Sequence, residues 1–185
     1  MNVEYEAEKD PSAIFMCRQR NHTGGTDILT ANYGGHDSCA DIVTITDITS
    51  FAFATRYIPP EREYRIHIGK TRQGNFYSIC AQRKYQPDNL IATSYIIRSW
   101  AHGWRFYTIR NLNNIPPNVL LYSKRAIQAL GLDFGAVDIL TTDEKSDDGL
   151  RKAYILEVNT APGLDERTAK RYADYFRKRL EYQEC

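Results

Sequence analysis

Two stretches near the end of the chain decide its fold. They read Gly131-Leu-Asp-Phe-Gly-Ala-Val-Asp138-Ile-Leu-Thr-Thr142 and Ala153-Tyr-Ile-Leu-Glu157-Val-Asn159-Thr-Ala-Pro-Gly163. Side chains that favour β-structure fill residues 135–142 and 152–159, which predicts a strand in each. The segment between them is polar and contains a glycine, as expected for the loop of a hairpin.

These two strands are expected to bring acidic and amide side chains together. The predicted pairing begins with Thr142 opposite Ala153. It sets Asp138 opposite Glu157, and Asn159 shares the face of Glu157 because it lies two residues further along the strand. Unpaired carboxylates among apolar strand neighbours would repel each other and lose solvation, and Mg²⁺ removes both costs by binding carboxylate and amide oxygens. The alternative is a solvated acidic end of the hairpin, in which Asn159 caps the turn.

The totals of the sequence limit what the protein can be. A chain of 185 residues with a net charge of +1 predicts one domain or two small lobes, and its charge implies no polyanionic partner. No stretch resembles a signal peptide or a membrane span, so we expect a soluble, cytoplasmic protein without a membrane partner. The four cysteines form no C-x-x-C pair, which favours reduced thiols. Trp100 and Trp104 are expected in core or lid packing rather than in a base-stacking platform, so nucleic acid is not an expected partner.

The N-terminal part contains a basic loop between two apolar runs. Residues 14–17 and 28–31 predict strands, and the loop that joins them carries Arg18, Gly24 and Gly25. Backbone N–H groups made accessible by glycine, with an arginine beside them, are one way to cover a phosphate. The alternative is an ordinary hairpin turn.

The stretch from residue 63 to residue 68 alternates strictly between polar and apolar side chains. This period predicts a strand with Glu63, Arg65 and His67 on one face. Arg83 belongs to the next strand of the same hairpin. The two arginines predict a clamp for an anion, and the alternative is that Arg65 pairs with Glu63.

Proline and glycine mark the ends of several elements. Pro59-Pro60 ends a strand and leaves backbone groups near residues 56–58 without obvious ladder partners. Pro116-Pro117 begins a helix, and Gly131 ends it. Asp165 is the expected N-cap of the last helix.

The sequence resembles the ATP-grasp superfamily. Gly131-Leu-Asp-Phe-Gly-Ala-Val-Asp138 followed by Leu156-Glu157-Val-Asn159-Thr-Ala-Pro-Gly163 is similar to the C-terminal metal-site motif of that superfamily. The stretch Glu63-Tyr-Arg65-Ile-His67-Ile looks like the central strand of its subgroup of ribosomal-protein glutamate ligases. The likeness is closest to that subgroup and to small ATP-grasp proteins encoded by large bacteriophages.

The resemblance implies an α+β ATP-grasp fold. It implies two lobes with antiparallel sheets and packed helices, and a nucleotide between the lobes. We expect a loose segment over residues 1–13, a reduced N-terminal lobe over 14–58, and a C-terminal lobe with the metal site over 59–185. The additional N-terminal domain that usually precedes the lobes is expected to be absent, in which case a partner protein could supply it.

The resemblance also implies roles for individual residues. Asp138, Glu157 and Asn159 match the ligands of one or two Mg²⁺ ions, with Mn²⁺ as an alternative metal. Arg65 and Arg83 match catalytic arginines near the transferred phosphoryl group.

Nucleotide binding is implied for a second group of residues. Residues 56–58 match the hinge beside adenine, and residues 23–25 match a glycine-rich cover loop. Arg18 takes the place of a lysine that contacts the phosphates. The whole set is Arg18, Thr23, Gly24, Gly25, Arg56, Tyr57, Ile58 and Glu63.

The implied activity is that of an ADP-forming carboxylate–amine ligase. It would use ATP and Mg²⁺ to join a carboxylate and an amine, neither of which the sequence identifies, through an acyl phosphate. A phage origin would place it in the host cytoplasm. Two alternatives are a nucleotide-binding interaction module without turnover and a kinase of the same fold.

Overall fold

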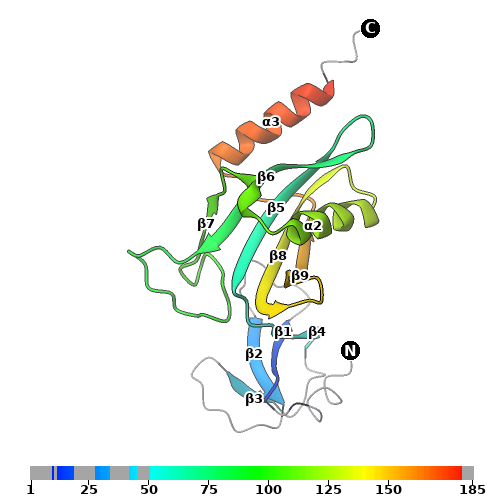
Figure 1. Cartoon of the computed structure of the whole chain (residues 1–185). Coiled ribbons are helices and arrows are strands. Elements are labelled where there is room, and N and C mark those ends of the chain that lie inside the picture. Colours follow the sequence, from blue (N-terminus) through cyan, green and yellow to red (C-terminus); the bar gives the residue numbers. More distant parts are fainter. Residues whose placement is uncertain (1–9, 11, 19–27, 34–41, 46–50, 181–185) are drawn as a thin grey trace. The chain divides into compact units, whose positions relative to one another are not determined.

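A computed structural model describes residues 10, 12–18, 28–33, 42–45 and 51–180 of the chain. The chain divides into two compact units, each with its own sheet (Figure 1). Unit 1 consists of Met1–Pro59 and Gln86–Arg105, and unit 2 of Pro60–Tyr85 and Phe106–Cys185. The first break between them therefore falls within the Pro59-Pro60 pair.

Unit 1 contains a four-stranded sheet with the strand order β3-β2-β1-β4. The strands are β1 (Ile14–Arg18), β2 (Ile28–Tyr33), β3 (Val43–Ile45) and β4 (Phe53–Arg56). β1 pairs antiparallel with β2 and β4, whereas β2 and β3 run parallel. Phe15 and Cys17 alternate with half-buried neighbours along β1, so both point into a small core that also includes Ala13 and Ala31.

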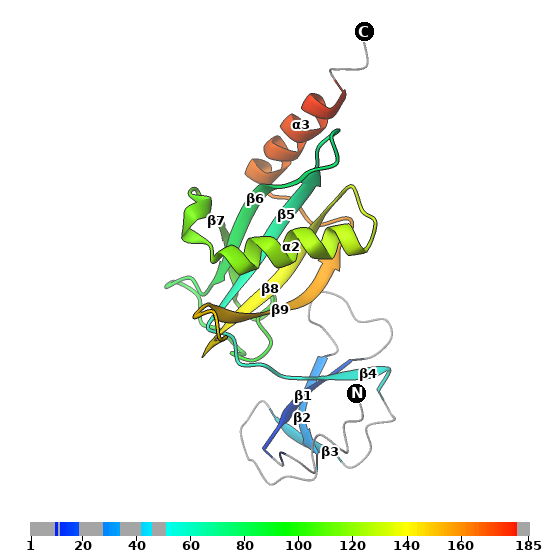
Figure 2. The ribbon, with the colours of Figure 1, turned by 45° about the vertical axis from the view of Figure 1, so that its right-hand side comes forward.

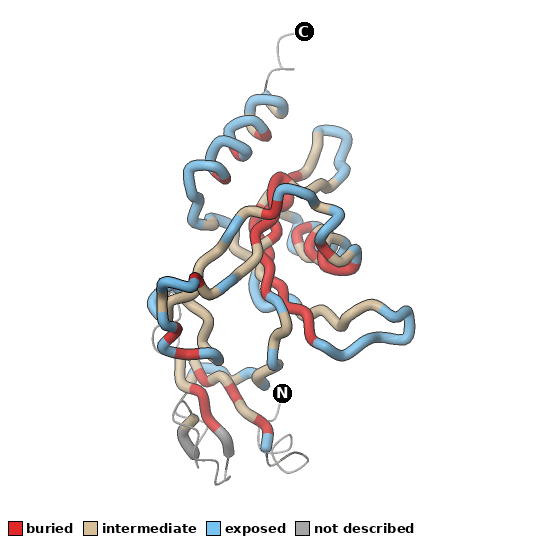
Figure 3. The backbone as a smooth tube through the Cα atoms, turned by 60° about the vertical axis from the view of Figure 1, so that its left-hand side comes forward, coloured by how far each residue is buried: buried red, intermediate tan, exposed pale blue. Residues whose placement is uncertain are grey.

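Unit 2 is built on a five-stranded sheet with the order β7-β6-β5-β8-β9. Its strands are β5 (Arg62–Lys70), β6 (Phe76–Tyr85), β7 (Arg105–Thr108), β8 (Phe134–Lys145) and β9 (Arg151–Asn159). β5 pairs antiparallel with β6 and β8, and β8 with β9. β5 and β8 thus lie inside the sheet, and most of their residues are buried; Figure 3 draws buried residues in red.

Helix α2 (Pro117–Ala129) covers one face of this sheet (Figure 2), after a short 3₁₀ helix, η1 (Leu112–Asn114). Val119 and Ile127 of α2 join the core that Tyr64, Ile66 and Ile139 form on that face. The helix begins at the predicted proline pair, and Gly131 just beyond its end has a φ of 66°, a conformation that suits glycine.

Helix α3 (Glu166–Leu180) packs on the other face of the sheet. Tyr172 and Tyr175 form a cluster with Ile79, and Phe134 packs against it. Asp165 caps the helix as predicted, because its Oδ1 accepts a hydrogen bond of 2.7 Å from the backbone N–H of Thr168.

The register of the β8–β9 hairpin confirms one predicted pairing and corrects another. Asp138 lies opposite Glu157 as predicted, but Ala153 lies opposite Thr141, not Thr142. An irregularity in the ladder between Asp138 and Ile139 shifts the register by one residue, because β9 carries one residue more there than β8.

The predicted α+β class is confirmed by the two sheets and the two α-helices. Within the described ranges, no helix is long and apolar enough to cross a membrane. Cys17 and Cys80 are buried free thiols, and burial raises the pKa of Cys80 to about 11, so this thiol is unreactive at neutral pH.

Candidate functional site

Four polar residues form a row across four neighbouring strands of unit 2. Arg65 of β5 lies between Gln82 of β6 and Asp138 of β8. Asp138 in turn lies opposite Glu157 of β9. Residues opposite each other on antiparallel strands share a face of the sheet, and this face is the one that α2 does not cover. We call it the Arg65 face.

Arg65 and Asp138 form the central ion pair of this row. Nε and one terminal nitrogen of Arg65 donate to the two carboxylate oxygens of Asp138 at 2.7 and 2.6 Å. The side chains are 21 % and 13 % exposed, so solvent reaches the pair from one side. Burial lowers the pKa of Arg65, but the hydrogen bonds and charge of Asp138 outweigh it and leave that pKa raised. The guanidinium is therefore a permanent charge on this face.

Glu157 and Asn159 continue the acidic side of the row. Glu157 is exposed and accepts a hydrogen bond of 2.8 Å from the Asn159 amide, which confirms that the two share a face. Asp138 and Glu157 carry two negative charges beside the single positive charge of Arg65.

The donor chemistry of this acidic end fits Mg²⁺. Two carboxylates and an amide oxygen are hard ligands, and the net charge of the row favours a cation. Asp138, Glu157 and Asn159 would hold the ion once the Asn159 amide turned its oxygen outward. No cluster of three or more His, Cys, Asp or Glu side chains suited to a metal occurs in the described part of the chain, so this mixed set differs from an all-ionisable centre.

A second ion pair lies beside the row. Lys84 Nζ donates to Glu63 Oε2 at 2.6 Å, and both side chains are largely buried. The ring of Phe106 lies 4.6 Å from the Arg65 guanidinium and 5.3 Å from Lys84 Nζ. The alternative pairing of Arg65 with Glu63 is therefore wrong, because Arg65 pairs with Asp138 and Glu63 pairs with Lys84. Sequence reasoning missed Lys84, although β-alternation places it on the face of Gln82.

A buried polar network joins the row to the start of α3. His67 Nε2 lies 3.3 Å from Gln82 Oε1, and His67 Nδ1 lies 3.1 Å from the Tyr172 hydroxyl. Gln82 Nε2 donates to Asp165 Oδ2 at 3.1 Å and to Thr168 Oγ1 at 3.3 Å. Because a carboxylate only accepts, Asp165 fixes the orientation of the Gln82 amide. Gln82 Oε1 then requires a proton on His67 Nε2, which leaves Nδ1 to accept from Tyr172.

This network influences the pKa values of His67 and Asp165. Burial lowers the pKa of His67, and the charge of Arg65 lowers it further, although Gln82 opposes both. His67 is therefore neutral at pH 7 and holds the tautomer described. Partial burial raises the pKa of Asp165, but hydrogen bonds from Thr168 outweigh this effect and leave it lowered, so the capping carboxylate is charged.

The structure does not bring Arg83 together with Arg65. Arg83 lies opposite Tyr64, whose side chain belongs to the core under α2. The Arg83 side chain is therefore on the face opposite to that of Arg65, where its guanidinium lies 5.0 Å from the ring centre of Tyr107. We leave Arg83 out of the candidate site.

The remaining predicted residues belong to unit 1. Arg18 of β1 donates to the Thr55 hydroxyl at 2.8 Å, and Arg56 pairs with Asp10. The N–H of Tyr57 donates to the carbonyl of Ile14 at 2.7 Å, so it already has a ladder partner, contrary to expectation. Ile58 is half-buried. Thr23, Gly24 and Gly25 lie outside the described residues.

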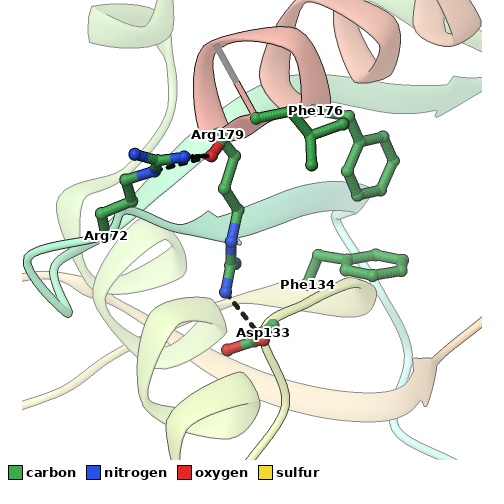
Figure 4. A pocket seen from close by; sticks show the side chains of 6 residues that line it. Arg72, Asp133, Phe134, Phe176 and Arg179 are labelled. Atoms are coloured by element: carbon green, nitrogen blue, oxygen red, sulfur yellow. Dashed lines mark hydrogen bonds and ion pairs between the residues drawn. The ribbon is translucent and has the colours of Figure 1, made fainter. Parts of the chain in front are cut away.

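A separate pocket of about 520 Å³ lies at the far end of α3 (Figure 4). In it, Arg179 extends from α3 to Asp133 at 2.8 Å, and Arg72 donates to the Arg179 carbonyl. The pocket walls come from Arg72, Asp133, Phe134, Phe176, Arg179 and Leu180. None of the predicted site residues lines it.

Comparisons with known proteins address the fold. No protein-family profile and no curated protein sequence matches the chain. Among solved structures, D-alanyl-alanine synthetase A from Vibrio cholerae O1 biovar eltor str. N16961 matches over 100 % of this chain, with a TM-score of 0.53 and 16 % identity. The ADP complex of PurK, N5-carboxyaminoimidazole ribonucleotide synthetase, matches over 87 %, with a TM-score of 0.50 and 15 % identity. Both are ATP-grasp enzymes.

The chain has the ATP-grasp fold. At such low identities, the likeness is evidence for the fold alone. The chain spans 52 % of the length of the first protein and 38 % of the second. The ATP-grasp fold predicted from the two C-terminal stretches is confirmed, whereas the glutamate-ligase subgroup and the phage origin stay predictions.

Proposed function

We propose that this protein is an ADP-forming carboxylate–amine ligase that binds the phosphates of ATP at the Arg65 face. The observation that carries the proposal is the row of Arg65, Asp138 and Glu157, which sets a fixed cation next to Asp138 and a second carboxylate next to that, on one face of the sheet. Support also comes from the fold, because the solved relatives named above are a synthetase and an ADP-bound synthetase.

Asp138, Glu157 and Asn159 would hold Mg²⁺ in this proposal. Bound there, the ion would offset phosphate charge and polarise the phosphoryl oxygens. The protein's own contribution is to hold the donor atoms together. Pairing with Arg65 keeps the Asp138 carboxylate oriented, and before the ion binds the hydrogen bond from Asn159 does the same for Glu157.

Arg65 and Lys84 supply the fixed positive charge of the site. Both cations are largely withdrawn from solvent and rest on the ring of Phe106, so little reorganisation is needed when an anion arrives. Nε and one terminal nitrogen of Arg65 are held by Asp138, so a phosphoryl group or an acyl phosphate would bind the N–H groups on the remaining edge of the planar guanidinium.

The reaction needs no covalent group from the protein. An oxygen of the substrate carboxylate attacks the γ-phosphorus of ATP, the bond to the bridging oxygen breaks, and ADP leaves. The amine then attacks the acyl carbon, phosphate departs with the bonding electrons, and the amine proton passes to solvent. Positioning and charge neutralisation are what such a transfer requires.

Substrate-stimulated ADP release tests the proposal. Purified protein with ATP and Mg²⁺ would be screened against amino acids and short peptides, as acids and as amines, and hydroxylamine would trap the intermediate. We expect at least one acid to stimulate ADP release and to yield a hydroxamate. ADP release with a phosphate ester and no hydroxamate would instead establish the kinase alternative. Nucleotide binding without any ADP release across the panel would establish the binding-module alternative.

The control for this experiment is Glu144→Gln. Glu144 also lies on β8 but is exposed and pairs with Lys152 at 2.7 Å, away from the row. It should keep full activity, whereas Glu157→Gln should lose at least about 100-fold in kcat/KM, the scale of one transition-state charge contact.

A further inference from the structure

A group of arginine and tyrosine side chains lies on the face of the unit 2 sheet that α2 covers, opposite to the Arg65 face. Tyr64 of β5 lies opposite Arg83 of β6, and the Tyr64 side chain belongs to the core under α2. Arg62 lies two residues from Tyr64, and Tyr85 lies two residues from Arg83, so both share this face. Diagonal neighbours on paired strands are within reach of long side chains. Arg62 and Arg83 therefore place two guanidinium groups near Tyr64.

Tyr107 of β7 joins these side chains into one cluster. The Arg83 guanidinium carbon lies 5.0 Å from the centre of the Tyr107 ring. The Tyr85 ring meets the same ring edge-on, with 5.4 Å between the ring centres. Tyr85 and Tyr107 are 38 % and 36 % exposed, so the two rings form an open aromatic rim beside Arg83. We call Arg62, Tyr64, Arg83, Tyr85 and Tyr107 the Arg83 cluster.

The positive charge of the Arg83 cluster is only partly balanced. Among the described residues, no carboxylate lies within ion-pair distance of Arg83, whose guanidinium contacts Tyr107. Arg62 pairs with Glu61 at 3.0 Å, but Glu61 also pairs with Arg151 at 3.1 Å. The Arg62 side chain is 45 % exposed, and a pair that solvent reaches this freely contributes little. Both guanidiniums are therefore available to an external anion.

The Tyr64 hydroxyl needs an acceptor that the described residues do not supply. Tyr64 is 2 % exposed, and its hydroxyl oxygen is buried without a hydrogen-bond partner in the described part of the chain. The hydroxyl lies close enough to Arg62 to raise the pKa of that guanidinium, but a guanidinium only donates and leaves the phenol proton without an acceptor. Buried polar groups are nearly always paired, so an unpaired donor beside two cations indicates a site for an anion.

The donors of the Arg83 cluster suit a phosphate monoester better than a carboxylate. Two guanidiniums and one phenol hydroxyl can each donate to an anion, and a phosphate monoester offers three terminal oxygens. Its charge at pH 7 is about −1.5 to −2, which matches the two cations, whereas a carboxylate carries a single charge. The exposed rings of Tyr85 and Tyr107 add a surface on which an aromatic group next to the phosphate would pack.

We propose that the Arg83 cluster binds a phosphate monoester that carries an aromatic group. Arg62 and Arg83 would donate to the phosphate oxygens, and Tyr64 would donate to a further oxygen once the exposed Arg62 side chain turned aside. The aromatic group would lie against Tyr85 and Tyr107. This site is on the opposite face of the sheet from Arg65, so the proposal does not depend on the proposed ligase activity.

Calorimetric titration of phenyl phosphate into the purified chain tests the proposal, with inorganic phosphate as the comparison. Both titrations are done at low ionic strength and without ATP. We expect phenyl phosphate to bind at least about fivefold more tightly than inorganic phosphate, because only phenyl phosphate contacts the tyrosine rim. The proposal is overturned if phenyl phosphate does not bind, or if it binds no more tightly than inorganic phosphate.

Charge variants then locate the bound phosphate. Arg83→Met should weaken phenyl phosphate binding about tenfold or more, since it removes a charge-assisted hydrogen bond. Lys170→Met is the charge-matched control, because Lys170 lies on α3 in an exposed pair with Glu166, and it should bind within about twofold of wild type. An equal loss in Lys170→Met would show non-specific charge attraction. A loss in Arg65→Met without one in Arg83→Met would place the phosphate on the Arg65 face. Either result would overturn the proposal.

Tyr64→Phe tests the role of the buried hydroxyl. We expect it to weaken phenyl phosphate binding about threefold or more and to leave the free energy of unfolding unchanged or higher, because an unpaired hydroxyl stabilises nothing. Urea unfolding measures the second effect. A less stable variant with the affinity of wild type would show that the hydroxyl serves the core, and would overturn its role in binding.

AMP and phosphotyrosine distinguish the two sources of such a ligand, since both join a phosphate monoester to an aromatic group. Their affinities would be compared between wild type and Arg83→Met, so that binding at the Arg65 face does not contribute to the difference. The compound with the larger loss identifies a nucleotide or a phosphorylated protein as the source, and supports the proposal. No loss for either compound would overturn it.

Discussion

Arg65 and Arg83 show how far a single residue's role can be predicted from sequence. Alternation along β5 places Arg65 with Glu63 and His67, and this prediction is confirmed because Tyr64 and Ile66 fill the opposite core. Which face Arg83 takes depends on the register across the β5–β6 hairpin. That register contains an irregularity at His67/Ile68, which no local pattern reveals.

Substitutions of the two arginines should therefore have different effects on the rate of ADP release. Arg65→Met removes the fixed cation of the row and should lower the rate of ADP release at least about 100-fold. Arg83→Met removes an arginine from the other face and should change that rate less than about threefold. Steady-state kinetics of both variants, with their folding checked by circular dichroism, would measure this. Equal losses would contradict the assignment of the site to one face.

His67 predicts a pH dependence of stability. Burial lowers its pKa in the folded state, so the unfolded chain binds a proton more readily. The stabilisation is fully present above the ordinary histidine pKa of about 6.5 and is lost as the pH falls below it. Urea unfolding of wild type and His67→Gln between about pH 7.5 and pH 5 should show a shallower decline in the variant. Parallel declines would mean that His67 is not buried in the neutral state.

At the scale of single elements, the β8–β9 hairpin delivers the acidic end of the site. Strand propensity and the polar loop predicted both strands and the pairing of Asp138 with Glu157. The irregularity beside Asp138 was not predictable, because inserting Leu156 into the ladder changes no propensity. The pairing of Asp138 with Glu157 was predicted correctly because both residues lie on the side of the irregularity where the predicted register holds.

Gly135 couples α2 to this hairpin. A Cβ there would come within 2.9 Å of Ile127 Cδ1 and 3.0 Å of the Asn159 carbonyl oxygen. Gly135→Ala should therefore lower the free energy of unfolding by about 1–3 kcal/mol, the usual cost of overpacking. Gly163→Ala meets nothing within 4 Å and should change it by less than about 0.5 kcal/mol. Equal urea midpoints for the two variants would show that the close approach carries no cost.

Helix α3 contacts the sheet through both its first turn and an apolar face. A 3.6-residue period predicts a buried stripe of Ala169, Tyr172, Phe176 and Leu180. Tyr172 is buried and Phe176 is half-buried, whereas Ala169 and Leu180 are exposed and Thr168 and Tyr175 are buried as well. The polar network at the cap adds contacts that a hydrophobic pattern does not encode.

The cap yields a stability prediction. Asp165→Ala removes both the capping bond and the partner of Gln82, and should cost about 1–2 kcal/mol. Asp174→Ala removes only an exposed pair with Arg177 and should cost less than about 0.5 kcal/mol. Chemical unfolding of both variants would measure the difference, and no difference would mean that the network does not hold α3.

At the scale of the whole molecule, the class, the strands and helices of unit 2 and the ATP-grasp fold were predictable from the sequence. The C-terminal motif carried these predictions, and the solved relatives bear out the fold. The assignment of residues 86–105 to unit 1 was not predictable, because it reflects tertiary contacts between distant segments. Trp100 is exposed and therefore does not pack in a core, so for this residue only the expected lid packing stays a prediction, while Trp104 is partly buried. The binding of adenine between the lobes stays a prediction.

Calorimetric titration of ATP into the purified chain, with and without Mg²⁺, tests the central claim most directly. The account predicts binding that is strengthened at least about tenfold by Mg²⁺ in wild type and in Glu144→Gln. It predicts that this Mg²⁺ effect disappears in Asp138→Asn and in Glu157→Gln. Undiminished Mg²⁺-dependent binding in both site variants, or no ATP binding by the folded wild-type protein, would contradict it.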